Sequence, residues 1–275
     1  MTEPGRLVLV ATPIGNLADL PPRAIDALRS AALVCCEDTR RTGRLLQHAG
    51  VRAQRLAVAN EHTEVARLGD MLDVLGSGGD VAVVTDAGTP GVSDPGERLV
   101  RAALDAGFEV TAVPGPAAVV MAVTISGLPT SRFVFEGFLP RSGRERAERV
   151  AEIAAEPRTS VIYEAPHRIQ RTLADLRAAC GDDRQVAVCR ELTKLFEQVL
   201  RGTLGEIDVG EPRGEYVVVL AGRPAETTIV DDDQIRDALR GELVAGSSKK
   251  DAVAAVSKRL GAPRKTVYAL AVALD

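Results

Sequence analysis

The feature of this sequence that most constrains its fold is a repeated alternation between short apolar runs and longer amphipathic stretches. In the first part of the chain the apolar runs are Leu7–Val10, Leu33–Cys36, Val81–Val84 and Glu109–Val113. Strands that alternate with helices predict an α/β domain built on a parallel sheet. Ligands of such open sheets bind beyond the carboxyl ends of the strands, so the segments that follow these runs are the expected place of a site.

The pattern changes after about Ala117. Five more strands are predicted, at Arg132–Phe138, Thr159–Tyr163, Gln185–Arg190, Glu197–Arg201 and Tyr216–Leu220. The last three follow one another closely enough to pair antiparallel, which predicts a second α/β domain with a mixed sheet. The expected domains are residues 1–115, residues 116–225, and residues 226–275 as a linker with a basic helical appendage.

The C-terminal segment differs from the rest of the chain in charge. Ala221–Asp233 has the composition of a linker, and Gly246–Asp275 holds six Lys and Arg against two Asp, whereas the whole chain of 275 residues has a formal net charge of −4. Ser248 begins a capping box, Gly261 ends that helix and Pro263 lies near the start of the next, which predicts a helical hairpin. A basic patch on an acidic protein favours a polyanionic partner, with a solvated helix face as the equal alternative.

Three loops rich in Gly and Pro follow predicted strands of the first domain, at Thr12–Asn16, Asp86–Gly96 and Pro114–Ala118. Gly lets the main chain approach a ligand closely and Pro fixes its direction, so a rigid main-chain cradle is expected. One such loop alone is more typical of a long turn, but three at strand ends favour a binding site. In the second loop, Asp94 is expected to cap a helix whose first residue is Pro95.

Several classes of site are disfavoured. The sequence has no GxxxxGK[ST] motif, and its Gly76–Gly79 run precedes a strand, so neither a P-loop nor a dinucleotide fingerprint is supported. The four Cys lack paired CxxC spacing and the three His lack an HExxH pattern, so no metal and no disulfide framework are expected. With aromatic residues at only 3% and no Trp, a platform that stacks single-stranded bases is disfavoured.

Membrane insertion and secretion are also disfavoured. The N-terminus lacks the basic segment and the long apolar core of a signal peptide. The uncharged stretch Val110–Leu128 is interrupted by Pro114 and Pro116, so it predicts a buried strand, a tight loop and a buried helix instead of a membrane span. A cytoplasmic protein is therefore expected.

Seven short motifs occur in order between Leu7 and about Leu220. They are TPIGN, EDTR (Glu37–Arg40), DAGTP with SDPG, PGP, EGFLP (Glu136–Pro140), YEAPHR (Tyr163–Arg168) and RELTK (Arg190–Lys194). Together they resemble the ribosomal RNA small subunit methyltransferase I family. The resemblance implies the tetrapyrrole-methylase superfamily, with two α/β domains and S-adenosylmethionine in the cleft between them. It further implies 2′-O-methylation of a cytidine ribose in small-subunit (16S) ribosomal RNA, on the free RNA or in the 30S subunit, by a homodimer.

The resemblance also implies the cofactor-binding residues, which are carried over motif by motif. They are Pro13 in the first loop; Asp86, Ala87, Gly88, Thr89, Pro90, Gly91 and Val92 in the second; Pro114, Gly115, Pro116, Ala117 and Ala118 in the third; and Leu139 and Tyr163 at later strand ends.

Candidates for the other roles come from charged segments. Glu61 and His62, with Glu64, are candidate general bases for the ribose proton, and the alternative is that this acidic cluster caps the helix at residues 64–75. In this segment Thr63 departs from the family pattern. Expected RNA contacts are Arg40, Arg41, Arg144, His167, Arg168, Arg190, Lys194, Lys249, Lys250, Arg264 and Lys265, with solvated surfaces and ion pairs as the alternative.

Two other functions remain open at this point. A small-molecule tetrapyrrole methylase would share the cofactor loops but would need a wide apolar trough for a macrocycle, and the basic C-terminal hairpin argues against it. A non-enzymatic nucleic-acid-binding regulator would use that hairpin but would leave the three loops without a purpose.

Overall fold

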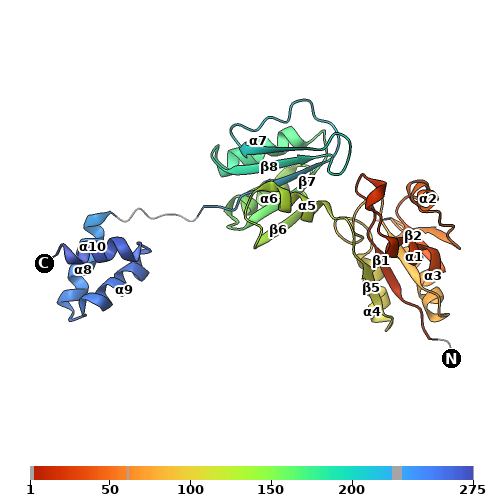
Figure 1. Ribbon diagram of the computed structural model, residues 1–275, viewed down its shortest axis with the longest axis horizontal. Helices are drawn as coiled ribbons and strands as arrows, with labels where there is room; N and C mark the ends of the chain where they lie inside the picture. Colours follow the sequence, from red (N-terminus) through yellow and green to blue (C-terminus); the bar gives the residue numbers. More distant parts are fainter. Residues whose placement is uncertain (1–2, 61, 225–230, 275) are drawn as a thin grey trace. The chain divides into compact units, whose positions relative to one another are not determined.

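The computed structural model describes residues 3–60, 62–224 and 231–274. The chain forms two compact units, residues 1–223 and residues 224–275. The first unit contains two five-stranded sheets (Figure 1). The predicted division of this unit between residues 115 and 116 stays a prediction.

The first sheet has the strand order β3-β2-β4-β1-β5, and all of its strand pairs are parallel. Its strands are β1 (Leu7–Val10), β2 (Leu33–Cys36), β3 (Leu56–Val58), β4 (Val81–Val84) and β5 (Val110–Val113). The predicted parallel α/β arrangement is thus confirmed. Strand β3 is not among the predicted strands. It has three residues and forms an edge of the sheet, and so short a run carries no periodicity of its own.

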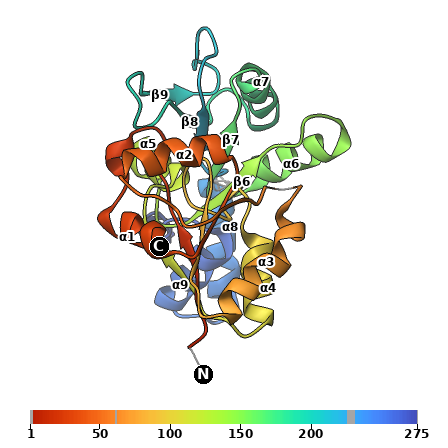
Figure 2. The same cartoon turned by 90° about the vertical axis from the view of Figure 1, so that its right-hand side faces the viewer.

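Helices cover both faces of this sheet. They are η1 (Leu17–Asp19), α1 (Pro22–Ser30), α2 (Thr39–His48), α3 (Glu64–Gly76) and α4 (Glu97–Asp105). Figure 2 shows α1 and α2 on one side of the strands and α3 and α4 on the other.

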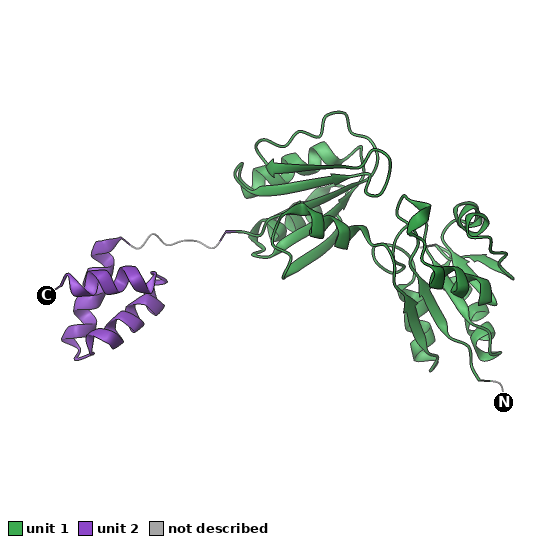
Figure 3. Ribbon diagram, viewed as in Figure 1, with its two compact units in different colours: residues 1–223 green, residues 224–275 purple. Residues whose placement is uncertain are grey.

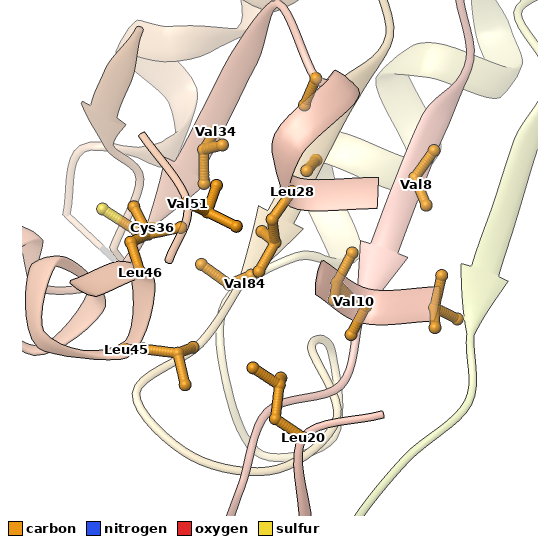
Figure 4. Packing of buried hydrophobic residues seen from close by; sticks show 14 residues of the cluster. Val8, Val10, Leu20, Leu28, Val34, Cys36, Leu45, Leu46, Val51 and Val84 are labelled. Carbon is orange, nitrogen blue, oxygen red and sulfur yellow. The ribbon is translucent and has the colours of Figure 1, made fainter. Parts of the chain in front are cut away.

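Each face has its own apolar core. On the first, Leu28 of α1 and Leu45 of α2 pack with Val10 and Val84 of the strands, as Figure 4 shows. On the second, Met71 and Leu75 of α3 pack with Leu99 and Ala103 of α4 against the strands. Burial of this apolar surface is the main favourable contribution to folding.

The second sheet has the order β6-β7-β10-β8-β9 and is mixed. Its strands are β6 (Phe133–Phe138), β7 (Thr159–Glu164), β8 (Gln185–Arg190), β9 (Gln198–Thr203) and β10 (Tyr216–Leu220). Strand β6 is parallel to β7, whereas β10 pairs antiparallel with both β7 and β8, and β8 pairs antiparallel with β9. The predicted mixed sheet and its antiparallel last strands are confirmed.

Three helices cover the second sheet, namely α5 (Ala118–Ser126), α6 (Gly143–Ala155) and α7 (Ile169–Cys180). Val119 and Val123 of α5 pack on one face, and the side chains of α6 and α7 pack on the other. The uncharged stretch Val110–Leu128 forms β5, a loop and α5, as expected. Among the described residues, no helix combines the length and the apolar character that a membrane span requires.

In the second unit, the described residues form the helices α8 (Asp232–Val244), α9 (Lys249–Leu260) and α10 (Arg264–Val272) (Figure 3). The predicted hairpin corresponds to α9 and α10 and lacks α8. Ile235 and Leu239 of α8 pack in the same core as Val253 and Val256 of α9. The start of α9 is confirmed, since the Ser248 hydroxyl accepts a hydrogen bond from the Asp251 amide at 3.2 Å. Most of the predicted linker lies outside the described residues.

Candidate functional site

A cavity of about 380 Å³ lies in the first unit, where the strand ends of the first sheet face residues of the second. The loops after β1, β4 and β5 form one part of its wall, and the ends of β6, β7, β8 and the start of β10 form the other. The lining residues are Ile14, Ala87, Gly88, Thr89, Val92, Ser93, Asp94, Ala117, Ala118, Phe138, Tyr163, Glu164, Ala165, Pro166, Leu192, Glu215, Tyr216 and Val217. The wall is mostly apolar, as is typical of small-molecule sites. We call this space the apolar cavity.

The three Gly/Pro loops are bonded to one another. Thr12 and Gly88 exchange both main-chain hydrogen bonds, at 2.8 and 3.0 Å, and the Thr89 hydroxyl donates to the Pro116 carbonyl at 3.2 Å. Gly88 has a φ of +82°, a conformation that side chains disfavour, which explains a glycine at this point. The predicted rigid main-chain arrangement therefore has a direct structural counterpart.

Tyr163 ties the second sheet to the start of α5. Its hydroxyl accepts a hydrogen bond from the Val119 amide at 2.9 Å, and its ring lies edge-on to Phe135 and Phe138 with centroids 4.8 and 5.7 Å away. Burial raises the pKa of this phenol, so it remains a neutral hydroxyl in the cavity wall.

The predicted cofactor residues fall into groups. Ala87, Gly88, Thr89, Val92, Ala117, Ala118 and Tyr163 line the apolar cavity. The others, Pro13, Asp86, Pro90, Gly91, Pro114, Gly115, Pro116 and Leu139, are not among its lining residues.

Two of these residues have another physical role. A Cβ on Gly115 would lie 2.9 Å from the Ala11 Cβ, so this glycine is required by its close packing against Ala11. Leu139 is 2% exposed and belongs to the core of the second sheet. The roles of Gly115 and Leu139 in cofactor binding stay predictions.

Several residues of the cavity wall are not among the predicted site residues. Phe138, Glu164 and Pro166 lie within the motifs EGFLP and YEAPHR, so the motifs could have indicated them. No sequence motif indicates Glu215, Tyr216 and Val217, which lie just before and at the start of β10. They reach the cavity only because β10 pairs between β7 and β8.

A second, polar cavity of about 710 Å³ lies beside the first. It is lined by Glu37, Asp38, Asn60, His62, Glu64, Asp86, Gly91, Ser93, Asp94, Pro95, Gly96, Glu97 and Arg98. Ser93 and Asp94 line both cavities. We call this space the polar cavity, and its wall is rich in carboxyl groups.

The candidate bases are placed differently from one another. His62 is exposed and lines the polar cavity, whereas Glu61 lies outside the described residues. Glu64 is 4% exposed, and its Oε1 accepts hydrogen bonds from the amides of Gly96 at 2.9 Å and Leu99 at 3.3 Å. Glu64 therefore caps α4, a helix other than its own.

This contact corrects the expected start of α4. The helix begins at Glu97, with Gly96 as its N-cap at a φ of +138°, and Asp94 makes no capping hydrogen bond. The local pattern predicted Asp94 and Pro95 in these positions, but the carboxylate that satisfies the amides comes from α3.

Burial and neighbouring charges raise the pKa of two carboxyl groups in the polar cavity. The pKa of Asp94 is raised to about 7, first by burial and then by Glu37, Asp86 and Glu215. Burial also raises the pKa of Asp86, which Arg41 opposes from 3.4 Å. Hydrogen bonds from Arg40 hold the pKa of Asp38 well below its usual range.

A third cavity, of about 440 Å³, shares Asp86 with the polar cavity. Arg41 and Arg44 of α2 line it, together with Pro13 and other residues of the adjacent loops. The α2 helix thus presents two cations next to the acidic cavity.

Several of the other predicted RNA-contact residues already make ion pairs. Arg40 lies 2.7 Å from Asp38, and Arg144 lies 2.6 Å from Glu148. Lys194 contacts both Glu191 and Glu215, at 2.8 and 2.7 Å.

Three more of these residues lie near the second sheet. Arg168 pairs with buried Glu164 at 3.2 Å and donates to the carbonyl groups of Leu139 and Pro140, which joins neighbouring strand ends. The Nε of Arg190 is buried without a hydrogen-bond partner in the described part of the chain. His167 is exposed.

The remaining predicted contacts lie together on the second unit. Lys249, Lys250, Arg264 and Lys265, with Val253 and Tyr268, line a groove of about 590 Å³ at the N-terminal ends of α9 and α10. The side chain of Tyr268 is 59% exposed. A cationic groove at two helix N-termini suits phosphate groups.

Comparisons with known proteins cover both units. Residues 6–208 match the family model of Tetrapyrrole (Corrin/Porphyrin) Methylases, and residues 230–275 match that of the RsmI C-terminal HTH domain. Proteins called ribosomal RNA small subunit methyltransferase I are similar over 98% of this chain. The protein from Synechocystis sp. is 41% identical, and the match covers 99% of its length. The protein from Xylella fastidiosa (strain Temecula1) is 45% identical over 99% of its length. The protein from Escherichia coli O157:H7 is 40% identical over 95% of its length.

Solved structures share the fold of the first unit. The methyltransferase CobJ superposes with a TM-score of 0.62 at 20% identity, over 79% of this chain and 94% of its own. A uroporphyrin-III-C-methyltransferase from Thermus thermophilus gives 0.53 at 22% identity, over 78% and 94%.

Proposed function

The chain belongs to the tetrapyrrole methylase family, in its ribosomal RNA small subunit methyltransferase I branch, and on that premise we propose that it methylates the 2′-oxygen of a cytidine ribose in small-subunit (16S) ribosomal RNA. That it is a ribosomal RNA methyltransferase follows from the family. The acceptor atom and the nucleoside are our proposal.

The observation that carries this proposal is the pair of adjoining cavities that share Ser93 and Asp94. A methyl transfer to RNA needs a largely apolar site for the adenosine of the donor and a polar site for the nucleotide. The apolar cavity has the first property and the polar cavity the second.

The residues of the apolar cavity fit S-adenosylmethionine. Apolar side chains such as Ile14 and Val92 suit the adenosine moiety, and the carboxyl group of Glu215 suits the cationic part of the molecule. Ala87, Gly88, Thr89, Ala117 and Ala118 would hold it. When bound, it supplies a methyl group on a positively charged sulfur.

The protein's own contribution is orientation, exclusion of water and removal of a proton. Fixing the ribose oxygen in line with the methyl group accounts for roughly 7–11 kcal/mol of barrier lowering. A positioned base adds roughly 10²–10⁴-fold in rate.

Positive groups outside the polar cavity support RNA as the acceptor. Arg41 and Arg44 line the adjacent cavity, so phosphate groups can be neutralised beside an acidic site that itself repels them. The groove of the second unit supplies further cations. We propose that these groups hold the ribosomal RNA or the 30S subunit.

The decisive experiment maps ribose methylation on 16S RNA from cells with and without this protein, and repeats it with purified protein and S-adenosylmethionine. We expect one cytidine to lose its 2′-O-methyl group in the deletion strain and regain it in vitro. Methylation of a base at that position, or transfer only to a tetrapyrrole, would contradict the proposal.

We also propose a homodimer that acts in the cytoplasm, where its RNA substrate is found. Sedimentation equilibrium of the full chain checks the first part, with twice the monomer mass of 29.0 kDa as the expected result.

A further inference from the structure

Asp94 occupies an unusual position between the two cavities. Among the described residues, only Ser93 and Asp94 line both the apolar and the polar cavity, and of the two Asp94 carries the carboxyl group. A group that removes a proton from the acceptor must reach the place where acceptor and methyl donor meet. Asp94 satisfies this requirement by position.

Asp94 is also free of the structural role that its sequence context predicts. The amide of Gly96 and that of Leu99 are bonded to Glu64, so α4 does not use Asp94 as a cap. Within residues 3–60, 62–224 and 231–274, no hydrogen bond or ion pair involves the Asp94 carboxyl group.

The neighbouring carboxyl groups are occupied. Glu37 accepts a hydrogen bond from the Asp86 amide at 3.3 Å, Asp38 caps α2 and pairs with Arg40, and Asp86 lies near Arg41. Glu97 is exposed and lines the polar cavity without lining the apolar one.

We propose that Asp94 is the general base that accepts the proton of the ribose 2′-hydroxyl, an inference that rests on the proposed function. In this step the 2′-oxygen forms a bond to the methyl carbon as its proton passes to a carboxylate oxygen of Asp94. The carbon–sulfur bond breaks and its electron pair stays on sulfur, which leaves a neutral thioether. The proton is later released to water.

The ionisation of Asp94 suits this role. Its pKa of about 7 lies near a physiological working pH, where a base is most effective. Because only the deprotonated carboxylate accepts a proton, the rate must rise with pH through about 7. The charged and titratable groups that line the two cavities around Asp94 are Glu37, Asp38, His62, Glu64, Asp86, Glu97, Arg98, Tyr163, Glu164, Glu215 and Tyr216.

Within the described part of the chain, His62 is the competing candidate, since Glu61 lies outside it. His62 lines the polar cavity but not the apolar one, so it does not reach the junction of the two. We therefore expect His62 to contact RNA or solvent, and we expect His62→Ala to keep the pH dependence of the methyl-transfer rate.

The test is single-turnover methyl transfer to RNA from about pH 5 to pH 9 with the full chain. We expect Asp94→Asn to lower the plateau rate by roughly 10²–10⁴-fold and to abolish the inflection near neutrality. Asp94→Glu should restore part of the rate with a shifted inflection. Asp105→Asn, an exposed change of the same charge at the end of α4, is the matched control and should behave as wild type.

Two readouts do not depend on turnover. Calorimetric binding of S-adenosylmethionine should change by less than about threefold in Asp94→Asn, since the lost interaction belongs to the transition state. In ligand-free protein, the carbon NMR signal of one side-chain carboxyl should titrate near pH 7 and be missing from Asp94→Asn.

The possible failures are distinct. An Asp94→Asn protein that keeps its rate within about threefold, or keeps the inflection, overturns the inference alone. A loss of cofactor affinity as large as the loss of rate makes Asp94 a cofactor ligand and also overturns it. If wild-type protein places no methyl group on ribose, the proposed function fails and the inference fails with it.

Discussion

At the scale of single residues, Glu64 joins two helices through its carboxylate. It is almost fully buried at the start of α3, and it satisfies two main-chain amides at the start of α4. Free amides at a helix N-terminus are costly to bury without an acceptor. Glu64 is therefore a structural residue that caps α4.

We predict that Glu64→Ala lowers the free energy of unfolding by about 2 kcal/mol, the combined cost of a lost cap and unsatisfied amides. The melting temperature should fall by about 4–8 °C. Glu64→Gln keeps the accepting oxygen and should lose less. Asp73→Ala, an exposed change on the same helix, is the control. If Glu64→Ala lost activity with its melting temperature unchanged, Glu64 would return as a catalytic candidate.

The raised pKa of Asp94 predicts a pH-dependent stability. Its carboxyl titrates near 7 in the folded protein and near 3.8, its ordinary value, in the unfolded chain. Between these values the folded state holds the proton more tightly, so the contribution of Asp94 to stability is complete at low pH and is lost as the pH rises through about 7.

We therefore expect Asp94→Asn to melt above wild type at pH 8 and level with it at pH 4. Since the carboxyl is only partly buried, solvent screening reduces the effect to on the order of 1 kcal/mol, or about 2–4 °C. The measurement is thermal unfolding of wild type, Asp94→Asn and Asp105→Asn at both pH values. A difference that is equal at the two values would contradict the raised pKa.

At the scale of elements, the start of α5 combines packing with a ligand wall. Ala118 lines the apolar cavity, whereas Val120, two residues later, is 55% exposed. Small side chains at the start of the helix leave room in the cavity. The helix interior, with Val119 and Val123, packs against the second sheet.

We predict that Ala118→Phe lowers the affinity for S-adenosylmethionine by about tenfold or more, equal to at least about 1.4 kcal/mol, because the ring occupies the cavity. Val120→Phe adds the same ring on the exposed side and should bind normally. Calorimetry gives the affinities and circular dichroism checks the fold. Equal affinities in two folded variants would contradict the assignment of this cavity to the cofactor.

At the scale of the whole molecule, the first unit holds the cavity rich in carboxyl groups and the second unit holds the cationic groove. The second unit is a three-helix body with its own core, and it carries the cationic groove. Removal of Gly246–Asp275 alone would leave Ile235 and Leu239 of α8 without their packing partners. Substitutions within the groove are therefore a cleaner test than truncation.

We predict that replacing Lys250, Arg264 and Lys265 together by Gln weakens RNA binding and lowers the slope of log affinity against log salt by about 2–3, since three cations no longer displace counterions. Cofactor affinity should not change. The control replaces Arg236 and Arg240, which pair with Asp residues on α8, by Gln. An unchanged salt slope in the groove variant would make the second unit structural.

Much of the fold and part of the site follow from the sequence by itself. Apolar periodicity predicted most of the strands and helices, although not β3, and the Gly/Pro loops after the strands indicated the wall that contains Gly88 and Ala118. These are local properties, because a strand's pattern or a glycine's left-handed conformation depends on a few neighbouring residues.

Only the tertiary structure decided which of the clustered acids is available for chemistry. Glu64 and Gly96 are far apart in sequence, and their hydrogen bond exists because α3 packs beside α4. That contact releases Asp94 from the cap that its own sequence predicts. In the same way, Glu215 reaches the apolar cavity through the insertion of β10 between β7 and β8. Such pairings depend on the packing of whole elements, which no short pattern of residues encodes.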